Sequence, residues 1–156
     1  QSENVSEHCH QVAVIAHMLV VIKNKRFGGS LNPERAATLA LYHEVSETKL
    51  QDMNTNTKYH SPEFTKAFKK RDELRPLIVQ SEVPPEYKEI VKAADILQAY
   101  IKTLNELRFN NDEFQHVEKN LSAKLQELKH SMPEVKCFLE IFVESCTLTL
   151  DKIINI

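Results

Sequence analysis

The sequence predicts an all-α fold, a compact helical bundle, and two observations carry this prediction. Only two glycines, Gly28 and Gly29, occur in 156 residues. Such a low number argues against an all-β fold with many tight turns, and it excludes glycine-rich phosphate loops and dinucleotide-binding fingerprints. Apolar residues also recur at helical spacing through most of the chain. At this length, residues 1–156 are expected to form one domain around a single core.

The first two helices have clear start and stop signals. Residues 5–25 carry an apolar stripe at helical spacing, and Gly28 and Gly29 follow it, where glycine tolerates the left-handed exit from a helix. Asn32 and Pro33 then provide an N-cap and a first helical residue. The second helix is expected to continue from there through His43 to Glu47.

The rest of the chain is expected to be mostly helical. Residues 51–62 are rich in asparagine and threonine and should form a polar loop. The charged segment 62–77 is weakly patterned but is also expected to be helical. Stronger helices are predicted over residues 84–107, 113–130 and 133–154.

Charge and composition narrow the possible partners. The formal net charge of −2 argues against a protein that coats a nucleic-acid polymer. The three cysteines have no metal-finger spacing, which favours a reduced, cytoplasmic protein over a secreted disulfide scaffold. No apolar run is expected to be long enough to span a bilayer, so no membrane partner is predicted. No signal peptide is evident, and because the chain begins at Gln1, an N-terminal segment is expected to be missing.

His43 and Glu44 form the most informative pair of residues. They are adjacent within an otherwise apolar stretch, and Glu47 follows four residues after His43. Such groups are costly to place near a core unless something neutralises them, and a divalent cation held by imidazole and carboxylate would do so. On a helix, Glu47 would share a face with His43. The alternative is a solvated polar edge of an amphipathic helix, and this segment alone leaves both interpretations open.

Two other segments offer similar side chains. His8 lies just before the apolar stripe of the first helix, and Asp95 lies among small and apolar residues. Taken singly, His8 could be a surface histidine, and Asp95 could bond a helix end or an arginine. Taken together, three distant segments each bring a histidine or a carboxylate into an apolar helix, and a bundle can converge them on one cation. A di-iron site at Glu113 and His116 is less favoured, because no second Glu-x-x-His pair appears.

This order of residues resembles the HD-domain superfamily of metal-dependent phosphohydrolases. The closer similarity is to the bacterial 5′-deoxynucleotidases of the YfbR-like family, and it covers nearly the whole chain. The segments that carry it are ENVSEH at 3–8, KNKRFGG at 23–29, LYHEVSE at 41–47, KAAD at 92–95 and EIFV at 140–143, together with Asp52, Thr55 and Lys58-Tyr59. The fold that this resemblance implies is the compact HD-domain helical bundle, usually dimeric.

The resemblance also implies a site and an activity. The implied ligands of one divalent cation, which could be Mn²⁺, Co²⁺, Fe²⁺ or Zn²⁺, are His8, His43, Glu44 and Asp95. Glu47 and Asp52 match acidic residues that orient or activate the attacking water, and Thr55 and Lys58 match a polar loop near the substrate. The implied reaction removes the 5′-phosphate from a 2′-deoxyribonucleoside 5′-monophosphate, and the implied assembly is a homodimer.

Three departures from the family pattern keep alternatives open. Glu44 stands where the family signature has aspartate, so a carboxylate oxygen moves by one methylene. The loop after Glu47 lacks the prolines and glycine of relatives, and the chain lacks both the N-terminal stretch with an arginine and any tryptophan. The stretch from Tyr59 to Asp95 also looks shorter than in relatives. The alternatives are a deoxynucleoside triphosphate triphosphohydrolase on the same fold, and a non-catalytic HD scaffold that binds metal or nucleotide.

Overall fold

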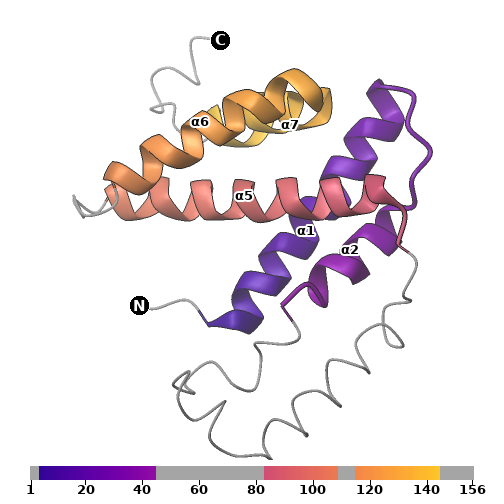
Figure 1. Cartoon of the computed structure of the whole chain (residues 1–156), viewed down its shortest axis with the longest axis horizontal. Helices are drawn as coiled ribbons and strands as arrows, with labels where there is room; N and C mark the ends of the chain where they lie inside the picture. The colour runs from indigo at the N-terminus through magenta and orange to yellow at the C-terminus, as the bar shows by residue number, and fades with distance from the viewer. Residues whose placement is uncertain (1–3, 45–82, 109–114, 145–156) are drawn as a thin grey trace, which may run out of the picture.

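The computed structural model describes residues 4–44, 83–108 and 115–144 (Figure 1). Within these ranges all regular structure is helical, so the predicted all-α class is confirmed. The elements, in chain order, are α1 (Val5–Arg26), α2 (Pro33–Leu41), α5 (Pro85–Arg108), α6 (Gln115–Ser131), α7 (Pro133–Phe138) and the π-helix η2 (Leu139–Glu144).

Helix α5 lies at the centre of this arrangement. It packs against α1, α2 and α6, while α7 packs against α1 and α6 (Figure 1). One cluster of buried residues joins all six elements, and its members on α1 and α5 include Val12, Ala16, Leu19, Ala94 and Leu97. Burial of each large aliphatic side chain contributes about 1.5–3 kcal/mol, and the small alanines allow helices to approach closely. The crossing of α1, α2 and α5 is therefore fixed by the core directly beside the candidate site.

Both ends of α1 are closed by specific residues. The Asn4 side chain accepts a hydrogen bond from the Glu7 backbone N–H at 2.9 Å, and the Glu7 carboxylate accepts one from the Asn4 N–H at 3.2 Å. This capping box fixes the first turn, which carries His8. At the other end Gly28 has a φ of 68°, a conformation that glycine adopts without strain.

Helix α2 is shorter than the sequence predicts. It ends at Leu41, and residues 42–44 form a turn, so the expectation of a continuous helix through His43 is wrong. In a longer helix the Ala40 carbonyl would accept the N–H of Glu44. Here the Ala40 carbonyl accepts the backbone N–H of His43 at 3.3 Å and also bonds the His43 ring Nδ1. The His43 side chain therefore shares the carbonyl at which α2 ends.

The end of the described chain differs in detail from its prediction. The helix expected over residues 133–154 is an α-helix only to Phe138 and then widens into the π-helix η2. The loop predicted at 51–62 and the helix predicted at 62–77 lie outside the described residues.

The hydropathy of α1 corrects the expectation that no apolar run is long enough to span a bilayer. An 18-residue window of α1 has a mean hydropathy of 1.4, so by length and composition this helix could cross a membrane. The core helix of a soluble protein passes the same test, and six buried residues of α1 belong to the common core.

Candidate metal centre

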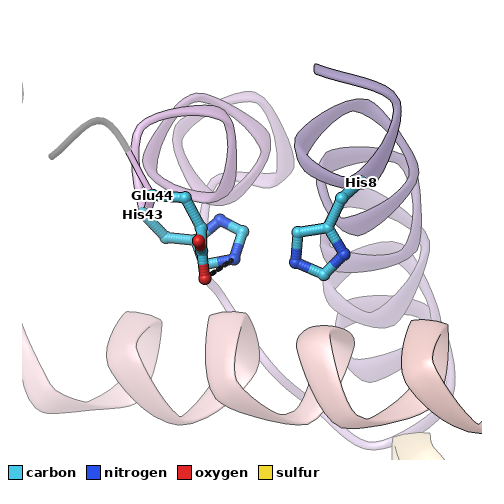
Figure 2. A group of neighbouring side chains, drawn as sticks. All are labelled: His8, His43 and Glu44. Carbon is cyan, nitrogen blue, oxygen red and sulfur yellow. Dashed lines mark ion pairs between the residues drawn. The ribbon is translucent and has the colours of Figure 1, made fainter. Parts of the chain in front are cut away.

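Three segments distant in sequence bring potential metal ligands together. His8 extends from the first turn of α1, and His43 and Glu44 extend from the turn after α2, so the two imidazoles face each other (Figure 2). Their ring centroids are 5.3 Å apart. One potential ligand atom from each of His8, His43 and Glu44 lies within 4.8 Å of the others.

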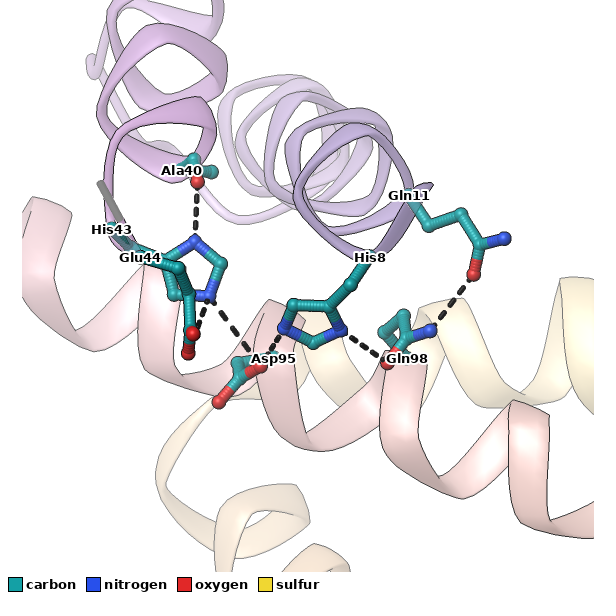
Figure 3. A network of polar contacts seen from close by, with 7 residues as sticks. All are labelled: His8, Gln11, Ala40, His43, Glu44, Asp95 and Gln98. Carbon is teal, nitrogen blue, oxygen red and sulfur yellow. Dashed lines mark hydrogen bonds and ion pairs between the residues drawn. The ribbon is translucent and has the colours of Figure 1, made fainter. Parts of the chain in front are cut away.

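Asp95 completes the group from α5. Its Oδ1 lies 3.0 Å from Nε2 of His8 and 3.6 Å from Nε2 of His43 (Figure 3). Glu44 Oε1 lies 3.6 Å from the same His43 nitrogen. The four side chains therefore meet, as the sequence predicts.

These separations suit one shared cation. Bonds from a divalent metal to imidazole nitrogen or carboxylate oxygen are about 2.0–2.2 Å long, so two atoms that share the metal lie roughly 3–4 Å apart. The three distances of 3.0, 3.6 and 3.6 Å fall within that interval. Mixed nitrogen and oxygen donors suit first-row transition metals.

The hydrogen bonds at the far side of each ring also fit metal binding. His43 Nδ1 bonds the Ala40 carbonyl oxygen, and His8 Nδ1 bonds Gln98 Oε1 at 3.0 Å (Figure 3). A metal-binding histidine commonly donates its second N–H to such an acceptor, which fixes the ring and directs its other nitrogen to the metal. In both histidines that other nitrogen is Nε2, which faces the centre.

The charges of the group suit a divalent ion. Glu44 and Asp95 bring two carboxylates to the centre. A histidine binds a metal through a neutral ring, so a single divalent cation would balance the two carboxylate charges.

The contacts between His43 and the carboxylates shift pKa values at the site. Burial disfavours a charged His43 ring, but the contact with Asp95, the Ala40 carbonyl and the charges of Asp95 and Glu44 outweigh it and raise the pKa of His43 above 6.5. The contact with His43 is the largest cause that lowers the pKa of Asp95, and it outweighs burial. In the metal-free protein, the stability from this pair is lost below the lowered pKa of Asp95 and above the raised pKa of His43.

A pocket opens beside the group. Its volume is about 420 Å³, and both His43 and Asp95 line it. The remaining wall is largely apolar, and Lys88 and Lys92 of α5 are its basic residues; it comprises Leu39, Tyr42, Val83, Tyr87, Lys88, Val91 and Lys92. The volume lies in the range of small-molecule sites.

The other predicted site residues cannot be placed. Glu47, Asp52, Thr55 and Lys58 lie outside the described residues. His116, from the less favoured di-iron pattern, is exposed on α6. Sequence reasoning also missed Gln98, although the signal was present: Gln98 follows Asp95 by three residues, and such residues share a helix face.

The fold and the site together define an HD-type phosphohydrolase fold. A crystal structure of an HD-domain phosphohydrolase from Listeria innocua superposes with a TM-score of 0.63 at 21% identity, covering 93% of this chain and 77% of the other. More specifically, the chain belongs to the 5′-deoxynucleotidase YfbR-like family, whose sequence model matches residues 1–74 and 69–146. The family resemblance noted from the sequence is thereby confirmed.

Curated relatives agree with this family. A 5′-deoxynucleotidase of Vibrio cholerae is 44% identical over 97% of this chain and 86% of the relative. A 5′-deoxynucleotidase of Shewanella oneidensis is 39% identical over 98% and 86%. The alignment with the Vibrio cholerae relative spans 169 positions, whereas this chain has 156 residues, so at least 13 of those positions have no counterpart in this chain.

Proposed function

We propose that this protein is a metal-dependent phosphohydrolase that removes the 5′-phosphate from 2′-deoxyribonucleoside 5′-monophosphates. The observation that supports this most directly is the meeting of His8, His43, Glu44 and Asp95 in a chain of the YfbR-like family. In this proposal the four residues are the ligands, and residues 1–156 form one HD-type domain.

The proposed cofactor is a single Mn²⁺, Co²⁺, Fe²⁺ or Zn²⁺ ion. When bound, such an ion supplies Lewis acidity, which lowers the pKa of water and offsets phosphate charge. The donor set of two imidazoles and two carboxylates supports a transition metal over Mg²⁺, which prefers oxygen ligands and retains its waters.

The chain's own residues bind and orient the nucleotide. The pocket beside His43 and Asp95 would take the nucleoside against its apolar wall, and Lys88 or Lys92 would offset the negative charge of the phosphate. Thr55 and Lys58 are proposed to contact the substrate from the loop that follows the site. Glu47 or Asp52 is proposed to take or steer the proton of the attacking water.

The cellular setting is part of the same proposal. The protein is proposed to act in the cytoplasm as a homodimer, as the family resemblance implies. Cys9 and Cys137 are buried as thiols, which suits a reducing compartment. Light scattering on the purified protein measures its mass directly, and a value near the 18.0 kDa of one chain would contradict the dimer.

A phosphate-release screen tests the activity. Ribo- and deoxynucleoside mono-, di- and triphosphates are each incubated with the protein and with Mn²⁺, Co²⁺, Fe²⁺ or Zn²⁺. We expect orthophosphate from deoxynucleoside monophosphates and much less from their ribose counterparts. Tripolyphosphate from a triphosphate would establish the alternative triphosphohydrolase. Metal binding with no turnover of any nucleotide would establish a non-catalytic scaffold, for which the substitution of glutamate at position 44 is the main argument.

A further inference from the structure

We propose that Gln98 is a positioning residue of the metal centre, which holds His8 in the orientation and protonation state that a metal ligand needs. This inference rests on the proposed function, because it assumes that His8 binds the cation. Gln98 lies outside the proposed ligand set. The proposal explains how the chain orients His8, one of the two histidines at the centre.

Helix α5 holds the His8 ring from both sides. Asp95 lies 3.0 Å from Nε2 of His8, and Gln98, one turn later on the same helix, lies 3.0 Å from Nδ1 (Figure 3). Because both partners project from one rigid helix, the plane and rotation of the ring are fixed relative to Asp95. A change at Gln98 would free the ring to rotate away from the centre.

Gln11 bonds the other end of the Gln98 amide. The Gln98 Nε2 group donates to Gln11 Oε1 at 2.8 Å, and the Gln98 oxygen points to Nδ1 of His8. An oxygen can only accept, and therefore Nδ1 of His8 must carry the hydrogen. In a neutral ring this arrangement leaves the lone pair on Nε2, the nitrogen that faces the centre. A flipped amide would present NH₂ to Nδ1 and favour the wrong tautomer.

Burial makes this interaction specific. Gln98 is only 3% exposed, so water cannot readily replace its amide. His43 receives the same support from the backbone oxygen of Ala40, which no substitution can remove. His8 is therefore the imidazole whose support depends on a side chain, and Gln98 is where metal affinity can be altered without touching a ligand.

The test measures binding of Zn²⁺ alone by competition with a chromogenic chelator. Gln98→Met keeps the size of the side chain but removes the acceptor, and it should weaken Zn²⁺ binding about 10–100-fold, as loss of such outer partners commonly does. Gln98→Glu restores an acceptor and should bind Zn²⁺ at least as tightly as the wild type. Thr103→Val is the matched control, because Thr103 is a buried polar residue of α5 whose hydroxyl donates to the Ala99 carbonyl of the same helix. It should keep wild-type affinity.

A second readout separates positioning from general stability. In the Zn²⁺-loaded wild type, the Nδ1 proton of His8 should give a slowly exchanging NMR signal, and this signal should vanish in Gln98→Met. If Gln98→Met does not fold, Gln11→Leu changes an exposed position, releases the amide and should weaken binding in the same direction. Unchanged affinity in the folded variants would overturn the role of Gln98 while leaving the metal centre intact. A wild-type protein that binds no metal would overturn both proposals.

Discussion

Glu44 is the residue at which this chain departs from the aspartate of the HD signature, and its side chain still reaches the site. Its Oε1 lies 3.6 Å from Nε2 of His43. The chain enters Glu44 through a turn rather than a helix, because α2 ends at Leu41. The longer side chain of glutamate therefore reaches the site from this turn.

Removal of the Glu44 charge should weaken the metal centre. Glu44→Gln keeps the shape of the side chain but removes its negative charge. The centre then has two imidazoles and a single carboxylate, that of Asp95, so its charge no longer balances that of a divalent ion. We expect Zn²⁺ affinity to fall by at least roughly 10–100-fold, because loss of a mere outer partner of a ligand already has an effect of that size. Glu127→Gln, at an exposed position of α6, is the control and should bind as the wild type does. Equal affinity in the two variants would remove Glu44 from the ligand set.

Glu47 is expected to act on water rather than on the metal. Glu47→Ala should abolish phosphate release and leave the metal content nearly intact, because the other four residues supply the ligands. His43→Ala should instead lose the metal. Metal analysis and a phosphate assay on the two variants separate these roles. Wild-type turnover in Glu47→Ala would show that another group, such as Asp52, moves the proton.

At the scale of elements, the sequence predicts most helix limits well. The expected helices at 5–25 and 84–107 agree with α1 (Val5–Arg26) and α5 (Pro85–Arg108) to within one residue at each end. Caps, prolines and glycines mark these ends locally, so a single sequence reveals them. The end of α2 is different, because α2 stops at Leu41, where the His43 ring bonds the Ala40 carbonyl, although the apolar pattern continues. No pattern in the neighbouring sequence predicts where α2 ends. The same is true of the change from α-helix to the π-helix η2 after Phe138.

The turn between α1 and α2 is expected to contribute measurably to stability. The Asn24 amide donates to the Leu31 carbonyl at 2.7 Å and accepts from the Leu31 N–H at 3.1 Å. Asn24→Ala leaves both backbone groups without this partner, and we expect the free energy of unfolding to fall by about 1–3 kcal/mol. Urea denaturation measures this change. Asn120→Ala, at an exposed position of α6, should have a much smaller effect.

A different substitution tests the backbone of the same turn. At Gly28 a Cβ would meet no atom within 4 Å, so any cost of Gly28→Ala comes from its φ of +68° alone. We expect a loss of about 1 kcal/mol, the usual penalty for a side chain in the left-handed region. At Gly29 a Cβ would lie 2.8 Å from the Asn24 amide oxygen, so Gly29→Ala should disturb the Asn24 bonds as well. Equal stability of Gly28→Ala and the wild type in urea would contradict the assigned backbone conformation.

At the scale of the whole molecule, the candidate site joins residues of α1, of α5 and of the turn after α2. His8 and Asp95 are 87 positions apart, yet their side chains are 3.0 Å apart. Periodicity places each of these residues on an apolar helix but says nothing about which helices cross. Their convergence could be predicted only because the order of residues resembles a known family. The bond between the buried Gln98 and Gln11 is not part of that order, and only the folded chain reveals it.

Because the proposed ligands come from α1, α5 and the turn after α2, metal binding should stabilise the fold as a unit. The unfolded chain cannot hold the four groups together, so an ion at 100 times its dissociation constant should add about 2.7 kcal/mol. For a protein of this size, that free energy corresponds to an increase in Tm of roughly 5–10 °C. Calorimetry with Zn²⁺ or Mn²⁺, and again after chelation, measures the shift. His43→Ala should show no increase on metal addition, and an increase as large as that of the wild type would mean that the ion binds elsewhere.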